Sequence, residues 1–263
     1  MLRWRHVVPA LKDKISLFIP ELPGYGISSS PPKADKRTVG KLILEALQEV
    51  FGKERPVIWC GHDRGARVGH RIMVDNDPSH NIKAGILMDI VPTLEQWRAF
   101  SNPVASSAYY HWPFLATDLA PAMIETMGGR YWCDANLNRT KGGNEAGLAK
   151  LKENQAWDHY CTQFSNPECI AGSCADYKSG AMDEPKEQES DQKEGKKVKI
   201  PMYVLYSATN LGRMHDVPEI WKQWVDGDLE AYGIPDGYGH YLPEECPDIV
   251  VKHVIEWIDH VGK

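Results

Sequence analysis

One five-residue stretch limits the fold of this chain more than any other feature, because it joins an apolar run to a helical pattern. The stretch is Gly61-His62-Asp63-Arg64-Gly65. Residues 56–60 before it read as a buried strand, and residues 66–75 after it read as a helix. This spacing is that of a nucleophile elbow, a tight turn that raises one side chain above the end of a sheet. Small residues two places before and after Asp63 avoid clashes there, and the helix N-terminus offers N–H groups that stabilise negative charge.

The same stretch allows a simpler interpretation, in which Asp63 only caps the helix, since Asp is favoured at that position. The strand, the helix and the partner residues below favour a nucleophile instead. A carboxylate nucleophile suits substitution at carbon and would form an ester that water must hydrolyse. That second step needs a base, usually His, that is oriented by an acid.

The chain alternates strands and helices on both sides of this elbow. Such alternation predicts an α/β fold, with a parallel sheet that is covered on both faces. The apolar runs predict strands at 15–20, 56–60, 84–90, 202–206 and 229–234, and the helical periods predict helices at 38–51, 66–75, 216–224 and 247–261.

The pattern changes between about residues 92 and 199, where aromatic residues are dense and Gly and Pro interrupt short helical periods. We interpret this stretch as a helical insertion. The predicted domains are therefore an α/β core formed by 1–92 and 200–263, and a helical cap formed by 93–199. The last part of the insertion, 183–199, is rich in charge and is expected to be a solvated helix or loop.

A base and its acid can be chosen from their places after strands. His240 follows the last predicted strand in a Gly-rich loop, where the elbow fold carries its base, although one of ten histidines could simply be a surface residue. Asp89 ends an apolar strand, where a carboxylate is costly unless it is paired. Asp216 is the alternative acid, but Pro218 and Glu219 after it are typical of a helix cap. We therefore choose Asp89.

Composition excludes several classes of function. The net charge is −6 and basic residues form no long patch, which argues against a nucleic-acid partner. No apolar run approaches the roughly 18 residues of a membrane span, and the first residues lack a signal-peptide core. Six cysteines without a CxxC pair indicate reduced thiols in a cytoplasmic protein and no structural zinc. We expect a small-molecule substrate and no cofactor, and we leave the oligomeric state open, with a homodimer as one option.

The chain resembles the fluoroacetate (haloacetate) dehalogenase family of α/β-hydrolases over nearly its whole length. An Arg directly after the elbow Asp, with a second Arg at position 67, is the specific feature. Epoxide hydrolases and haloalkane dehalogenases, which are also similar, usually carry Trp where this chain has Arg64. The resemblance implies the α/β-hydrolase fold with a helical cap. It is carried by residues 4–11, 20–26, 61–71, 87–93, 110–112 and 174–180.

This resemblance implies a role for each matching residue. Asp63 matches the nucleophile, His240 the base and Asp89 its acid. Arg64 and Arg67 match the pair that holds the substrate carboxylate, and guanidinium groups suit that anion because each can bind it through two N–H groups. The alternative is that both arginines simply lie on the surface of the helix.

The same resemblance implies a site for the departing halide. His111, Trp112 and Tyr177 match the residues around it, and their imidazole N–H, indole N–H and phenol O–H are three donors suited to a small anion. The alternative is that these aromatic side chains only pack inside the cap, as aromatic residues usually do.

The sequence departs from the family pattern in two places. Family members begin with additional strands and a His-Gly loop before the Trp-containing helix at which this sequence starts. That loop normally supplies one of two oxyanion donors, and the other is the backbone N–H of Arg64. We therefore expect an N-terminally truncated fold, with one side of the sheet uncovered and a loss of about 10²–10³ in rate. The charged tract 184–199 is the second departure.

Three functions are compatible with these residues. The leading hypothesis is a hydrolytic dehalogenase of short 2-haloacids. The second is an epoxide hydrolase with the same three catalytic residues, which would need cap hydroxyl groups to protonate the epoxide oxygen. The third is a binding protein or remnant that no longer turns over. The tyrosines available for the second function are Tyr109, Tyr110, Tyr131, Tyr160 and Tyr177.

Overall fold

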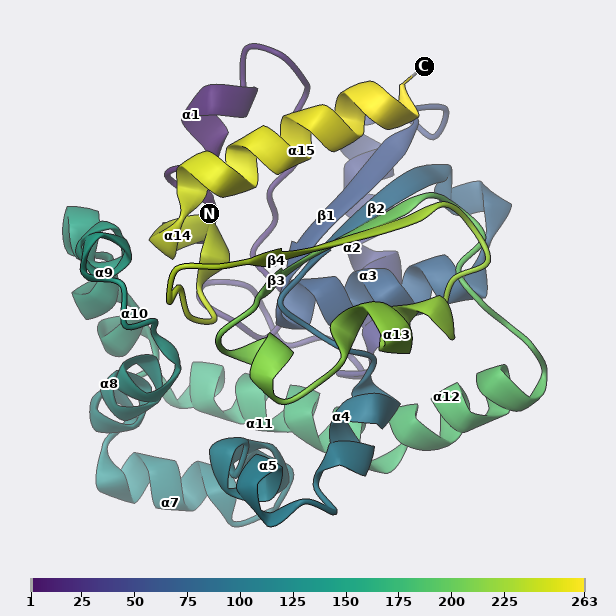
Figure 1. Cartoon of the computed structure of the whole chain (residues 1–263). Coiled ribbons are helices and arrows are strands. Elements are labelled where there is room, and N and C mark those ends of the chain that lie inside the picture. The colour runs from purple at the N-terminus through teal and green to yellow at the C-terminus, as the bar shows by residue number, and fades with distance from the viewer. Residues whose placement is uncertain (1, 263) are drawn as a thin grey trace.

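A parallel sheet forms the centre of the molecule, as the alternating pattern predicts. The computed structural model of the chain describes residues 2–262 (Figure 1). All neighbouring strands pair in parallel, in the order β1-β2-β3-β4, with Cys60 opposite Ile86 and Ile86 opposite Tyr203. The carboxyl ends of the strands therefore meet at one edge of the sheet. The strands are β1 (Val57–His62), β2 (Ile82–Met88), β3 (Met202–Ser207) and β4 (Leu229–Ile234).

Helices cover both faces of this sheet and give the molecule two cores. Helices α2 (Lys36–Phe51), α3 (Arg64–Asp75) and α13 (Val217–Lys222) pack on one face, and α1 (Val8–Leu11) and α15 (Pro247–Val261) pack on the other (Figure 1). Leu87 and Val204 point to the first core, whereas Ile86 and Leu205 point to the second. Burial on both faces explains why these strands are apolar without alternation.

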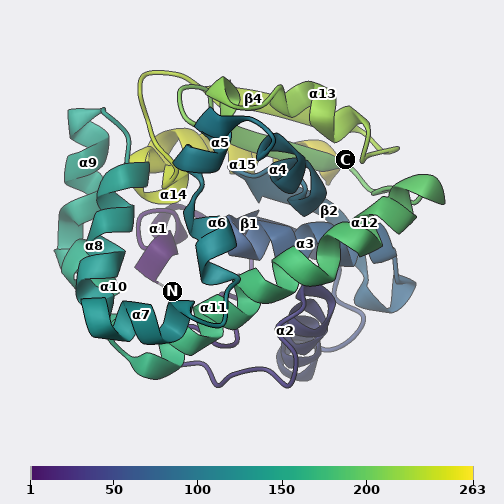
Figure 2. The same ribbon diagram turned by 90° about the horizontal axis from the view of Figure 1, so that it is seen from below.

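A group of short helices connects β2 to β3 and lies at the carboxyl ends of the strands. Figure 2 shows α6, α8 and α11 of this group on the side that is seen from below. A further short helix, α14 (Leu242–Glu245), precedes α15. The connecting helices are α4 (Thr93–Ala99), α5 (Pro103–Ala108), α6 (His111–Leu115), α7 (Ala120–Met127), α8 (Gly129–Thr140), α9 (Glu145–Lys152), α10 (Ala156–Gln163), α11 (Pro167–Met182) and α12 (Glu184–Lys193).

The structure also describes the state of the cysteines and the character of the helices. All six cysteines are free thiols. Among the described residues, no helix combines the length and the apolar character that crossing a membrane would require. Single turns of 3-10 helix lie at Leu2–Trp4, Pro78–His80, Glu153–Gln155 and Leu211–Arg213.

The predicted strand at 15–20 is wrong. The segment belongs to no sheet, and within residues 2–262 the strand β1 pairs with β2 alone. Leu17 packs against one core and Phe18 against the other, so the side chains alternate as they would in a strand. The apolar pattern therefore reflects burial on two sides, and it cannot reveal whether a neighbouring strand pairs with the backbone.

The charged tract was expected to be solvated, and this is also wrong in part. Helix α12 buries Glu184, Gln188 and Asp191, each 4% exposed. Asp191 pairs with Arg71, and Gln188 accepts a hydrogen bond from the backbone N–H of Leu94. A charged helix can bury one face in this way because each buried polar group finds a partner on a neighbouring helix.

Candidate active site

Asp63 occupies a sharp turn between β1 and α3. Its backbone has φ +48° and ψ −116°, a conformation that costs a non-glycine residue about 1–3 kcal/mol. A Cβ atom on Gly61 would lie 2.6 Å from the carbonyl carbon of Gly65, so position 61 must be glycine. A Cβ atom on Gly65 would meet nothing within 4 Å, and the expected crowding is therefore confined to the first glycine.

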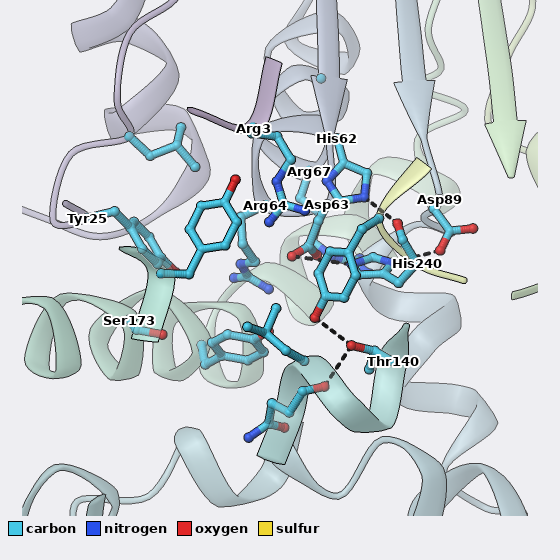
Figure 3. Close-up of a pocket in the computed structure, with 18 of the residues that line it drawn as sticks. Arg3, Tyr25, His62, Asp63, Arg64, Arg67, Asp89, Thr140, Ser173 and His240 are labelled. Atoms are coloured by element: carbon cyan, nitrogen blue, oxygen red, sulfur yellow. Dashed lines mark hydrogen bonds and ion pairs between the residues drawn. The ribbon is translucent and has the colours of Figure 1, made fainter. Parts of the chain in front are cut away.

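The three residues chosen from the sequence as nucleophile, base and acid lie together (Figure 3). His240 Nε2 is 3.6 Å from Asp63 Oδ2, and His240 Nδ1 is 2.7 Å from Asp89 Oδ2. The second oxygen of Asp89 accepts a hydrogen bond of 2.7 Å from the backbone N–H of Ser207. The alternative acid, Asp216, is exposed and caps α13 through the N–H of Glu219.

In the free enzyme, the electrostatics of the site favour an ion pair between a protonated His240 and the carboxylates that face it. Burial disfavours the imidazolium, but Asp63 and Asp89 raise the pKa of His240 to about 9. Burial also opposes the charge on Asp63, yet His240 and Arg64 hold its pKa well below the usual value. Burial raises the pKa of Asp89 despite its hydrogen bond with His240. His240 is therefore protonated near neutral pH for as long as both carboxylates face it.

The loop that carries His240 is held from several sides. The buried carboxylate of Glu245 accepts hydrogen bonds from the backbone N–H groups of Gly239, Gly142 and Tyr241, at 2.7, 3.0 and 3.2 Å. His62 Nε2 donates to the carbonyl oxygen of His240 at 2.7 Å. Sequence reasoning missed Glu245, although an acidic residue in the helix just after the base is a usable signal. Removing such a buried acceptor would leave three N–H groups unpaired, at about 1–3 kcal/mol each.

Arg64 and Arg67 are each 6% exposed, so they are not surface arginines of α3. Arg64 Nε donates to Oδ2 of Asp176, and Arg64 Nη2 donates to the backbone oxygen of Asp176 at 3.2 Å. Lys36 pairs with both Asp176 and Glu184. In this cluster two cations, Lys36 and Arg64, balance two carboxylates.

Arg67 has no such partner. Its Nη1 donates to the carbonyl oxygen of Val91 at 2.9 Å, and its buried Nε has no hydrogen-bond acceptor among residues 2–262. The same part of the chain offers it no carboxylate within 4.0 Å. Burial, together with the charge of Arg64, lowers the pKa of Arg67 to about 10. A buried cation without a counterion is a natural receptor for an anion.

The three predicted halide donors are near these arginines. The guanidinium carbon of Arg67 lies 4.4 Å from the ring centre of Trp112, and that of Arg64 lies 4.2 Å from the ring centre of Tyr177. The ring of Tyr177 is 5.8 Å from that of His111 and 5.7 Å from that of Trp112. All five residues line one cavity of about 750 Å³, which also contains Asp63 and His240.

The five tyrosines available for an epoxide hydrolase are spread over different places. Tyr110 and Tyr131 are exposed and do not line the cavity. Tyr160 lines it, but its hydroxyl donates to Glu244 at 2.9 Å. Tyr109 and Tyr177 line the cavity, and burial raises the pKa of both, so that they stay protonated. Of the five tyrosines, these two are therefore the candidates for an acid in this cavity.

Sequence reasoning missed other charged residues of the cavity wall. Arg3 lines the cavity (Figure 3). Its guanidinium carbon lies 4.9 Å from the ring centre of Tyr241, and its Nη1 lies 2.9 Å from Oε2 of Glu244. Arg139 of α8 also lines the cavity. Neither arginine belongs to a recognisable sequence motif, because each reaches the cavity from an element that is far from the elbow along the chain.

Comparisons with known proteins agree with this fold. The model of the alpha/beta hydrolase family matches residues 2–253. A fluoroacetate dehalogenase from Burkholderia sp is 28% identical, over 97% of this chain and 82% of the relative. A soluble epoxide hydrolase from Corynebacterium sp. (strain C12) is 26% identical, over 97% of this chain and 84% of the relative.

A solved structure shows the same fold. The crystal structure of an alpha/beta hydrolase from Nostoc sp PCC 7120 superimposes with a TM-score of 0.86 at 29% identity, over 98% of this chain and 87% of that one. The family match covers nearly all of the chain, and the two curated relatives are both hydrolases. The chain therefore belongs to the alpha/beta hydrolase family and is a hydrolytic enzyme.

Proposed function

We propose that this hydrolase removes the halide from short 2-haloacids. One observation carries the proposal: Arg67 is a buried guanidinium without a counterion among residues 2–262, in the cavity that holds the carboxylate of Asp63. A substrate carboxylate would complete the charge balance there and would place the neighbouring carbon near Asp63. The resemblance of the chain to a fluoroacetate dehalogenase from Burkholderia sp supports this substrate class.

In the first half of the reaction, an oxygen of Asp63 attacks the carbon that carries the halogen. The new C–O bond forms as the carbon–halogen bond breaks, and the halide leaves with the bonding electron pair. His111, Trp112 and Tyr177 donate hydrogen bonds to the departing anion, where negative charge develops. Arg67 holds the substrate carboxylate throughout, and Arg64, held by Asp176, adds a second positive charge.

In the second half, water hydrolyses the ester on Asp63. Esterification removes the negative charge that faces His240 Nε2, so the pKa of His240 falls from its resting value of about 9. The neutral imidazole then takes a proton from water, and Asp89 stabilises the resulting imidazolium. The backbone N–H of Arg64, at the first position of α3, stabilises the oxyanion. The water oxygen bonds to the carbonyl carbon of the ester, and the bond from that carbon to the alkoxy oxygen then breaks. The leaving alkoxide takes the proton from His240, which gives a 2-hydroxyacid and regenerates the carboxylate of Asp63.

The helices between β2 and β3 form the roof of this site in our proposal. Residues of α6, α8, α10 and α11 line the cavity opposite Asp63. We propose that residues 93–199 are a cap and that residues 1–92 and 200–263 are the catalytic core. Water is then excluded from the first step, in which it would compete with Asp63.

An epoxide hydrolase is the second candidate, because Tyr109 and Tyr177 offer protonated hydroxyls to the cavity and one curated relative is a soluble epoxide hydrolase. Purified protein should be incubated separately with fluoroacetate, chloroacetate and styrene oxide. We expect halide release from the two haloacids and no diol from styrene oxide. Diol formation without halide release would establish the second candidate, and bound haloacid without any turnover would show a binding protein.

At alkaline pH, the kcat/KM for a haloacid is expected to depend on the ionisation of Arg67. Its charged form binds the substrate, is present below its pKa of about 10, and is lost as the pH rises through that value. The kcat/KM for chloroacetate should therefore fall above about pH 10. Arg67→Lys should move this fall to lower pH, since an ammonium begins from a lower pKa and meets the same burial. A flat alkaline limb in both proteins would exclude Arg67 as the carboxylate receptor.

A further inference from the structure

Arg139 of α8 contacts His111 of α6, and Arg139 has no role in the reaction steps proposed above. Arg139 Nη2 lies 3.0 Å from Nδ1 of His111 and also donates to Oδ1 of Asn136 at 3.0 Å. Arg139 Nη1 donates to the backbone oxygen of Ala108, just before α6. The guanidinium is thus fixed at three points, and one of them is the imidazole ring.

This contact determines where the proton of His111 lies. A guanidinium has only donors, so Nδ1 of His111 must be the acceptor and the ring proton must be on Nε2. Nε2 is on the opposite edge of the ring, and among residues 2–262 the hydrogen bond of the ring is the one at Nδ1. The ring lines the same cavity as Asp63. The free N–H is therefore available to a ligand in that cavity.

The charges around His111 keep it neutral. Burial lowers its pKa well below the usual value, and the charge of Arg139 lowers it further. Asp63 opposes this shift, whereas His240 and Arg64 add to it. Tyr177 faces the ring from α11, and Tyr109 and Tyr110 flank it on the chain. A second proton on the ring would also place a cation 3.0 Å from the Arg139 guanidinium.

We infer that Arg139 is a positioning residue that holds His111 as the neutral Nε2–H tautomer and so fixes a hydrogen-bond donor on the leaving halide. The inference rests on the proposed dehalogenase function. Fluoride is the halide that accepts hydrogen bonds most strongly, so its departure depends most on a correctly placed donor. Arg139 therefore sets how well the enzyme handles fluoride relative to larger halides.

Nitrogen-15 NMR of histidine-labelled protein tests the tautomer without turnover. His111→Gln assigns the resonances of His111, and Arg139→Met removes the donor while keeping most of the side-chain volume. We expect wild-type His111 to remain the Nε2–H tautomer across the neutral range. In Arg139→Met it should populate the Nδ1–H form or become protonated as the pH falls. Arg139→Lys should restore the wild-type spectrum in part, because an ammonium also donates to Nδ1.

Kinetics test the consequence for the leaving group. The ratio of kcat/KM for fluoroacetate to that for bromoacetate should fall about tenfold in Arg139→Met, since a displaced or wrongly protonated donor affects fluoride most. Arg130→Met is the matched control on the same helix, because Arg130 forms an exposed ion pair with Asp158. This control should leave both the spectrum and the ratio unchanged.

The possible results separate this inference from the proposed function. A wild-type ring that is protonated on Nδ1, or an unchanged ratio in Arg139→Met, would overturn the inference while halide release still supported a dehalogenase. If the wild-type protein releases no halide from any haloacid, the proposed function fails and the leaving-group role of Arg139 fails with it. A fixed Nε2–H tautomer would then show only a structural hydrogen bond.

Discussion

Replacing Asp63 with Asn is expected to lower the turnover of a 2-haloacid by at least about 10⁴-fold, because an amide oxygen does not form the ester intermediate. The change is nearly isosteric. Asn also tolerates positive φ better than most residues, so the strained turn at φ +48° should persist. The loss would then report chemistry and not folding. Halide release measured on freshly prepared protein checks it, with circular dichroism as a test of the fold.

Asp216→Asn is the matched control for this experiment. Asp216 is the other carboxylate that the sequence offered for the site, but it is exposed and caps α13, a role that Asn also fills. Its variant should keep the wild-type rate within about twofold, since surface changes of this kind cost about 0.5 kcal/mol or less. Wild-type dehalogenation by Asp63→Asn would show that another group attacks the substrate.

Replacing His240 with Gln is expected to stop the reaction halfway. Asp63 would still displace the halide, so each enzyme molecule should release about one halide ion in a burst. Multiple turnover should then fall by about 10²–10⁴-fold, the usual contribution of a general base. Asp63 also loses the cation at 3.6 Å that stabilises its charge, but Arg64 still lowers its pKa. The ester on Asp63 should therefore accumulate.

Mass spectrometry identifies this intermediate directly. After incubation with chloroacetate, the peptide that contains Asp63 should gain the mass of one carboxymethyl group, and Asp63→Asn should show no such gain at this position. His253→Gln is the control, because His253 lies on α15 and shares a hydrogen bond with Tyr203, away from the cavity. Continued turnover by His240→Gln without an ester would rule out the two-step mechanism.

Local chemistry explains which parts of the fold could be predicted. Leu229–Ile234 and Pro247–Val261 have the predicted bounds, since each combines a clear periodicity with turn or proline signals at its ends. Helix α2 begins two residues earlier than expected, because Asp35 caps it through the N–H of Thr38. The segment at 15–20 and the charged helix α12 were predicted wrongly. In both cases the deciding partner lies far away in the chain.

The candidate site divides in the same way. Asp63, His240 and Asp89 could be chosen from the sequence alone because each follows a strand, and the carboxyl ends of parallel strands meet at one edge of a sheet. The sequence also indicates two arginines beside the nucleophile. It carries no information on which of them is already neutralised, because that depends on contacts between helices that are more than a hundred residues apart.

Only the tertiary structure decided which of the two arginines is neutralised. Asp176 of α11 reaches Arg64 of α3, whereas Arg67 has no counterion in the described part of the chain, and Arg139 of α8 reaches the ring of His111. The elbow and the alternation of strands and helices follow from local patterns of polarity and backbone geometry, which a sequence displays directly. The charge balance and the proton position depend on distances of about 3 Å across the cavity, and side-chain electrostatics at that range exist only after the helices have packed.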